Sequence, residues 1–240
     1  MRLFLIALSF FTRIPIQLKK EVTTDDFYRS MKLIAFVGMV VGGVLYMAAR
    51  LTESFDPPVT AVFLIVVSLF LTGGIHLDGY MDSLDGMLSN RPKEEVFQIM
   101  KDSRVGAFGA IGMVLLLLVY FVFFQFVSFT ALLLMPVVGR GCAVLSASMT
   151  RYAKENKQLG GRFVDDMTFK DFLWTFIFAL LLAAFIDWRL IPVTMGTFAL
   201  AALLTKWIEG KIDGTTGDTI GFVIESGQMM FLMIAYIGGI

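Results

Sequence analysis

The sequence predicts an all-α integral membrane protein: a polytopic helical bundle with about seven transmembrane helices and one further N-terminal helix. Hydrophobic residues make up 57% of the chain, whereas about 45–50% is usual for soluble domains. Six uncharged runs approach or exceed the roughly 17–25 residues that a spanning helix needs. No linker or internal repeat divides the chain. We therefore expect a single membrane domain over residues 1–240.

The predicted spans follow from these runs, which cover residues 33–49, 57–75, 105–139, 172–186, 190–205 and 226–240. The third run is too long for one span, because its 35 residues would form a helix of about 52 Å against a hydrocarbon core of about 30 Å. A hairpin near Val127 to Thr130 divides it, which makes seven spans. A further N-terminal stretch, residues 2–17, is interrupted by Arg13 and Pro15, so we expect it to lie at the interface or to enter the bilayer partway.

The basic residues predict the orientation of the chain. Loops 19–32, 77–104, 150–171 and 205–213 hold fifteen Lys and Arg residues, and the loops on the other side hold only Arg50 and Arg189. By the positive-inside rule, the four basic loops face the cytoplasm and the C-terminus at Ile240 faces outward. We expect a protein of the cytoplasmic membrane whose active-site loops are cytoplasmic. Polar motifs on one face indicate chemistry at one membrane surface, and nothing in the sequence indicates nucleic-acid binding.

The most informative polar motif is GIHLDGYMDSLDG, which starts at Gly74. If the helix that begins near Pro57 continues through His76, then Asp78, Asp82 and Asp85 share one helical face. Like charges repel, so this array predicts a bound divalent cation, and oxygen ligands favour Mg²⁺ or Mn²⁺ over zinc. Mg²⁺ typically binds to one or two protein carboxylates together with phosphate oxygens of the substrate, which suggests a diphosphate-bearing substrate. The alternative is a solvated loop with Gly79 and Gly86 as turn residues.

The second motif, Lys101-Asp102-Ser103-Arg104, precedes the next apolar run. Lys101 and Arg104 suit phosphate oxygens, although both residue types also anchor membrane proteins at the cytoplasmic surface. The segment 151–171 is polar and predicts an exposed loop or a short amphipathic helix. His76 is either a packing or hydrogen-bonding residue at a helix end or a metal ligand, and the first is favoured because no second His or Cys completes a transition-metal set.

The third motif is GTTGDTIG, which contains Gly217 and Asp218 and is followed by Glu225. Asp218 and Glu225 are seven residues apart and would share a helical face. Glu225 lies in an apolar run, where a carboxylate is costly unless it is paired or binds a metal, so it is a functional candidate. Arg140 needs a partner for the same reason, and we expect an acidic residue of the aspartate cluster.

Together with FFTRIP at residues 10–15, these motifs resemble the cobalamin synthase family of adenosylcobinamide-GDP ribazoletransferases. Each motif alone is weakly specific, but all four occur in order across nearly the whole chain. The chain differs from the family pattern at Leu77, where an acidic residue is common. This difference removes one metal ligand and leaves Asp78 as the better candidate.

The resemblance implies a polytopic membrane enzyme that needs Mg²⁺ and performs the final nucleotide-loop assembly of cobalamin. It would join adenosylcobinamide-GDP to α-ribazole or α-ribazole 5′-phosphate and release GMP. The metal ligands are expected to be Asp78, Asp82 and Asp85. The catalytic residues are expected to be Asp82, Asp85, Lys101, Asp102 and Arg104. The substrate-binding residues are expected to be Arg13, His76, Ser103, Arg140, Gly217, Asp218 and Glu225.

Several questions stay open at this level. Asp102, Asp218 and Glu225 are unranked as general base or as ligands of a second metal. The sequence also does not decide whether the protein forms a homo-oligomer or associates with other cobalamin-assembly enzymes. Asp82-x-x-Asp85-Gly86 matches the opening of the CDP-alcohol phosphotransferase signature, although residues 87–91 depart from the remainder. A transporter of divalent cations or small solutes is the non-enzymatic alternative, and few polar residues continue across the spans to support it.

Overall fold

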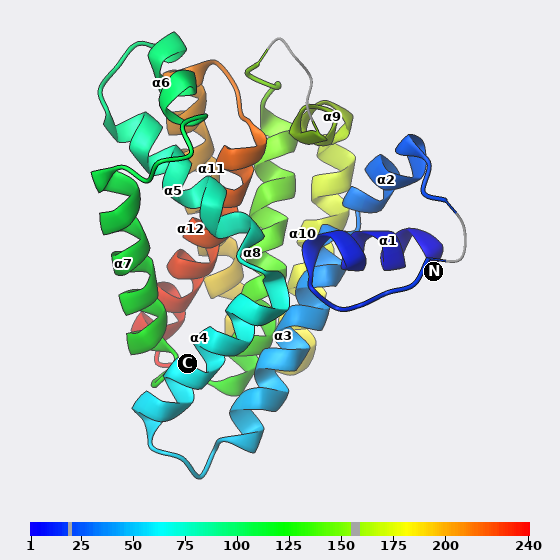
Figure 1. The fold of residues 1–240 in the computed structure, drawn as a ribbon. Coiled ribbons are helices and arrows are strands. Elements are labelled where there is room, and N and C mark those ends of the chain that lie inside the picture. Colours follow the sequence, from blue (N-terminus) through cyan, green and yellow to red (C-terminus); the bar gives the residue numbers. More distant parts are fainter. Residues whose placement is uncertain (19–20, 155–158) are drawn as a thin grey trace.

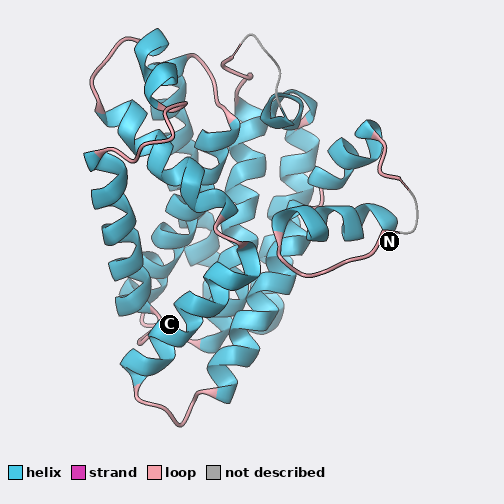
Figure 2. Ribbon diagram, in the orientation of Figure 1, coloured by secondary structure: helices cyan, strands magenta, loops and turns pink. Residues whose placement is uncertain are grey.

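The computed structural model describes residues 1–18, 21–154 and 159–240, and these residues form a helical bundle (Figures 1 and 2). The helices are α1 (Arg2–Phe11), α2 (Thr24–Met31), α3 (Ile34–Leu51), α4 (Pro57–Thr72), α5 (Ile75–Leu88), α6 (Lys93–Ile99), α7 (Ala107–Phe123), α8 (Phe129–Met149), α9 (Leu159–Asp166), α10 (Phe169–Ile186), α11 (Leu190–Ile212) and α12 (Gly217–Ile237). No strand is found in the ranges described. Lys19, Lys20 and Lys157, which the basic-loop count included, lie outside them.

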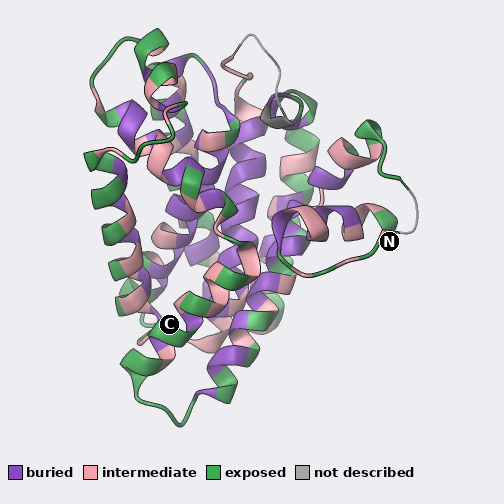
Figure 3. Cartoon of the chain, viewed as in Figure 1, coloured by how far each residue is buried: buried purple, intermediate pink, exposed green. Residues whose placement is uncertain are grey.

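Helix α8 is the centre of the bundle. It packs against α3, α10, α11 and α12, and most of its residues are buried (Figure 3). Gly38 and Gly42 bring α3 against α8, because a Cβ at Gly38 would lie 2.5 Å from the Pro136 carbonyl oxygen and one at Gly42 would overlap the Leu133 carbonyl. These small residues let the backbones of α3 and α8 come into direct contact.

Five of the described helices are long and apolar enough to cross a membrane: α3, α8, α10, α11 and α12. The bent pair α4–α5 would make a sixth span, and α7 is apolar but shorter. The predicted count of seven is therefore not confirmed, although every predicted run overlaps at least one helix. The predicted hairpin is confirmed, since α7 ends at Phe123 and Ser128 caps α8 by accepting a 3.2 Å hydrogen bond from the Ala131 N–H.

The prediction that the helix from Pro57 continues through His76 is wrong. Helix α4 ends at Thr72, α5 begins at Ile75, and the two helices are bent by 96°. Gly73 and Gly74 form the break with φ of 64° and 67°, in a left-handed conformation that glycine adopts without steric cost. The alternative in which Gly79 and Gly86 are turn residues is also wrong, because both lie inside α5.

The N-terminal helix α1 lies crosswise to the long helices (Figure 1) and packs against α2 and α3. Its 10 residues extend only about 15 Å, too short to span a bilayer. The bundle has two ends. The polar end comprises α5, α6 and α9 with segments 100–106, 150–154 and 213–216, and the opposite end comprises the connections 52–56, 124–128 and 187–189.

Candidate active site

The acidic face of α5 carries Asp78, Asp82 and Asp85, as the sequence predicts. Asp78 is exposed, Asp82 is half-buried and Asp85 is buried. Asp82 interacts electrostatically with both other aspartates and also with Asp218, at the start of α12. Residues from two separate sequence motifs therefore form one cluster of negative charge at the polar end.

Two glycines explain how α12 comes so close to α5. A Cβ at Gly79 would lie 2.7 Å from the Asp218 Cα and carbonyl oxygen, and one at Gly221 would lie 2.9 Å from the His76 carbonyl oxygen. The two helix backbones are therefore in direct contact at both positions, which no larger residue permits. The contact brings the N-terminus of α12, the positive end of its helix dipole, beside the aspartates.

Segment 150–154 supplies a cation to the cluster. The Ala153 N–H donates to the Thr215 carbonyl at 2.9 Å, and the Thr215 N–H donates to the Arg151 carbonyl at 3.0 Å, so this segment is fastened to the one that leads into α12. As a result, Lys154 Nζ lies 3.4 Å from an Asp218 carboxylate oxygen, with only 14% of the lysine side chain exposed. Lys154 also attracts Asp82 electrostatically. The sequence placed Lys154 in a polar segment but did not assign it to the site.

Tyr152 lies in the same electrostatic environment. Burial raises the pKa of its hydroxyl, and the carboxylates of Asp218 and Asp165 raise that pKa further. Both causes disfavour a phenolate, so Tyr152 stays protonated beside the acidic cluster. The negative potential at this end therefore extends beyond the α5 face.

Asp85 has a different environment from its two neighbours. One carboxylate oxygen accepts a 2.8 Å hydrogen bond from the Gly106 N–H, and the other accepts a 2.9 Å hydrogen bond from the Gly109 N–H. Asp85 therefore satisfies free N–H groups at the start of α7 and ties this helix to α5. Its predicted role as a metal ligand stays a prediction.

The carboxylates at this end supply oxygen ligands, which Mg²⁺ prefers. Among the described residues, no group of three or more His, Cys, Asp or Glu side chains is arranged to hold a metal ion. Asp78 and Asp82 nevertheless fit Mg²⁺, which typically takes one or two carboxylates and completes its shell with water and phosphate oxygens. A protein site of this kind is open toward its substrate.

The loop at residues 101–104 is held by its own ion pair. Arg104 donates to Asp102 from its backbone N–H, Nε and Nη2, and the shortest of these hydrogen bonds is 2.6 Å. The hydrogen bonds from Arg104 lower the pKa of Asp102 to about 2. Lys101 and Ser103 are exposed. Within the described part of the chain, neither Lys101 nor Arg104 forms an ion pair with the aspartates of α5.

Glu225 and Arg140 lie deeper in the bundle. Tyr120 Oη donates to a Glu225 carboxylate oxygen at 2.6 Å, and Gln228 Nε2 donates to the same oxygen at 3.0 Å. The acid that interacts electrostatically with Arg140 is Glu225, instead of the expected aspartate cluster. Tyr120 and Gln228 were not predicted as partners of Glu225, although a polar side chain in an apolar span indicates a candidate functional residue.

Arg13 and His76 lie near the break between α4 and α5. The Arg13 N–H donates to the Leu71 carbonyl at 2.7 Å, and its side chain covers Gly73. His76 lies in the first turn of α5 and borders a cavity of about 210 Å³ whose other walls come from α1, α2, α3, α9 and α12. Gly217 and Asp218 border the same cavity. The structure thus brings three of the predicted substrate-binding residues together.

A bundle of apolar helices with a carboxylate cluster, a half-buried lysine and a cavity at one end defines an integral membrane enzyme. Comparison with known proteins specifies the class further. The profile of the cobalamin-5-phosphate synthase family matches residues 3–236. The chain belongs to this family, which confirms the resemblance read from the four motifs, and it is a transferase.

The curated relatives carry the name adenosylcobinamide-GDP ribazoletransferase. The protein from Alkaliphilus oremlandii is 37% identical over 238 residues, covering 99% of this chain and 98% of the relative. The protein from Clostridium acetobutylicum is 34% identical over 241 residues, covering 98% of this chain and 96% of the relative. No solved structure matches the chain significantly.

Proposed function

We propose that this enzyme joins adenosylcobinamide-GDP to α-ribazole or α-ribazole 5′-phosphate and releases GMP, which completes the assembly of cobalamin. The names of the relatives support the transfer and both substrates. The observation that carries the proposal is the meeting of Asp78, Asp82 and Asp218 with Lys154 beside a cavity. Such a cluster suits a substrate that carries a diphosphate and a second substrate that carries a nucleophilic hydroxyl.

In the proposed reaction, a ribazole hydroxyl oxygen forms a bond to the phosphorus attached to cobinamide, and the bond from that phosphorus to GMP breaks. Negative charge then spreads over the phosphoryl oxygens. A divalent cation held by Asp78 and Asp82 would neutralise part of this charge when bound. Lys154 and the N–H groups at the start of α12 are the chain's own positive groups there. Asp85 positions α7, so its contribution would be structural.

The hydroxyl proton needs an acceptor. Asp102 and Glu225 are not among the described residues that border the cavity, and Glu225 already accepts hydrogen bonds from Tyr120 and Gln228. Asp218 borders both the cavity and the acidic cluster, which makes it the best-positioned candidate for general base. Its ion pair with Lys154 would orient its carboxylate.

We also propose that the polar end faces the cytoplasm of the cell that makes the protein, with the C-terminus outward. The support is the excess of Lys and Arg in the loops at this end. Helix α12 starts at the polar end and runs toward the opposite end, where Figure 1 labels the C-terminus. Labelling of single introduced cysteines from outside intact cells tests the orientation, and labelling at segment 213–216 would contradict it.

The test of the proposed function is release of GMP from adenosylcobinamide-GDP by purified protein in detergent, with and without α-ribazole. We expect release only when both substrates and Mg²⁺ are present, and loss of release after chelation with EDTA. Turnover of a CDP-activated alcohol, without turnover of adenosylcobinamide-GDP, would support the alternative assignment as a CDP-alcohol phosphotransferase. Full activity in EDTA would contradict the metal requirement.

A further inference from the structure

The cavity beside the acidic cluster has the size of a small ring system. Phe10 and Phe11 of α1 and Phe163 of α9 form aromatic walls, and Ile220 and Ile224 of α12 also line the cavity. Its volume is about 210 Å³. An apolar protein cavity of about 150 Å³ accommodates benzene. This cavity therefore suits one ring or two fused rings, and it is much too small for a tetrapyrrole-like macrocycle.

His76 borders this cavity, and one of its buried ring nitrogens lacks a partner. His76 is 7% exposed, and its Nε2 makes no hydrogen bond to any described residue. Its ring lies 6.0 Å from that of Phe11, with 34° between the ring planes. An unpaired buried nitrogen costs free energy, and native proteins seldom keep one without a reason. Apolar walls with a small number of polar groups are typical of a ligand pocket.

The cavity adjoins the candidate active site at Asp218. His76 precedes Asp82 by six residues on α5, a rise of about 9 Å along the helix. Asp218 borders the cavity and also interacts with Asp82. A ring in the cavity could therefore carry a sugar past Asp218, so that a hydroxyl of that sugar reaches the carboxylates.

We propose that this cavity binds the planar heteroaromatic base of the ribazole acceptor, with His76 Nε2–H donating to the ring nitrogen that does not carry the ribose. This inference rests on the proposed function and identifies where its second substrate binds. Stacking between the base and the phenylalanine rings supplies most of the contact, and the single hydrogen bond fixes the orientation of the base.

The guanine of the other substrate is also planar and bicyclic, but it fits this cavity poorly. Guanine has several donors and acceptors around its edge, whereas His76 and Asp218 are the only polar side chains that border the cavity in the described part of the chain. Burying guanine there would leave polar groups unpaired, each at a cost. The ribazole base has one free ring nitrogen, which matches the one unpaired histidine nitrogen.

The test uses two variants and one matched control on the full-length protein in detergent. His76→Phe keeps an aromatic ring and removes the hydrogen bond. Ile75→Phe enlarges a cavity-lining side chain that is 39% exposed, and Ile177→Phe makes the same change on α10 at a side chain that is 38% exposed. Equilibrium dialysis measures binding of α-ribazole without any need for turnover, and free 5,6-dimethylbenzimidazole serves as competitor.

We expect His76→Phe to raise the KM for α-ribazole, and to weaken its binding in dialysis, about tenfold, while the KM for adenosylcobinamide-GDP stays within twofold. Ile75→Phe should weaken α-ribazole binding and Ile177→Phe should not. If His76→Phe does not fold, as judged by gel filtration, the isoleucine pair still decides the question.

Three outcomes would overturn the inference. The first is unchanged α-ribazole binding in both cavity variants. The second is an increase in KM for adenosylcobinamide-GDP alone, which would assign the cavity to guanine. The third is equal weakening by Ile75→Phe and Ile177→Phe. The proposed function fails separately: in that case the wild-type protein binds α-ribazole in dialysis but releases no GMP when both substrates are present.

Discussion

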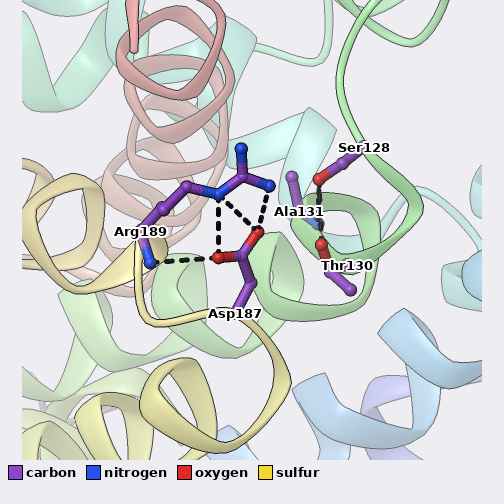
Figure 4. A network of polar contacts seen from close by, with 5 residues as sticks. All are labelled: Ser128, Thr130, Ala131, Asp187 and Arg189. Carbon is purple, nitrogen blue, oxygen red and sulfur yellow. Dashed lines mark hydrogen bonds and ion pairs between the residues drawn. The ribbon is translucent and has the colours of Figure 1, made fainter. Parts of the chain in front are cut away.

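The same Asp-x-Arg turn occurs at both ends of the molecule. At the opposite end, Arg189 donates to Asp187 from its backbone N–H at 3.0 Å, from Nε at 3.1 Å and from Nη2 at 2.8 Å (Figure 4). At the polar end, Arg104 donates to Asp102 from the same three groups at 3.0, 3.0 and 2.6 Å. At both ends, the aspartate and the arginine of the turn therefore neutralise each other.

The difference between the two ends lies in the charges that remain. At the opposite end, Arg50 also pairs with Glu53, three residues away on the same segment. At the polar end, Asp82 faces three other carboxylates across two helices, against the attraction of Lys154. Helix packing holds these like charges together although they repel. Charge that the fold leaves uncompensated, and not the number of charges, separates the candidate site from an ordinary polar surface.

The largest expected effect follows removal of one charge from the cluster. Asp82→Asn should lower the rate of GMP release by about 10²–10³-fold, because it removes both a metal ligand and part of the preorganised field. The melting temperature in detergent should stay the same or rise, because repulsion is relieved. Asp187→Asn, at the opposite end, should retain activity. Near-wild-type activity of Asp82→Asn would remove this residue from the mechanism.

Loss of the half-buried cation should have the next largest effect. Lys154→Gln leaves Asp218 unpaired and removes positive charge from the phosphoryl site, so we expect a tenfold to hundredfold loss of GMP release, with partial recovery in Lys154→Arg. The control is Lys206→Gln, which breaks an exposed ion pair with Glu209. Equal activities of the two glutamine variants would contradict a role for Lys154.

The backbone contact between α5 and α12 can be tested separately from charge. Gly79→Ala places a Cβ 2.7 Å from the Asp218 backbone, so we expect destabilisation of about 1–3 kcal/mol and a several-fold loss of activity as Asp218 moves. Gly43→Ala is the control, because its Cβ would meet nothing within 4 Å. Melting temperatures in detergent should fall for Gly79→Ala only. A melting temperature for Gly79→Ala equal to that of the control would mean that the contact yields easily.

The smallest expected effect compares the two Asp-x-Arg turns directly. Arg104→Ala should raise the KM for adenosylcobinamide-GDP less than tenfold, since this exposed guanidinium would contribute only at the edge of the diphosphate site. Arg189→Ala should leave both KM values within twofold. Equal behaviour of the two variants in steady-state assays would make the turn structural at both ends and would remove Arg104 from the proposed site.

Much of the fold follows from local patterns in the sequence. The apolar runs, the hairpin capped by Ser128 and the packing glycines of α3 were predictable, because hydrophobic length and residue size act over a few turns of helix. The break after α4 was not predicted, because a Gly-Gly pair can continue a helix or adopt left-handed φ angles. The shared face of Asp78, Asp82 and Asp85 survived this error, because all three lie on α5.

The sequence by itself therefore determined the membrane helices, the family and the aspartate face. Tertiary structure decided which partners that face meets: Asp218 across the Gly79 contact, Lys154 through segment 150–154, and α7 through Asp85. It also paired Glu225 with Tyr120, 105 residues away in the chain. Helical periodicity carries information over several residues only, whereas these contacts depend on how whole helices pack.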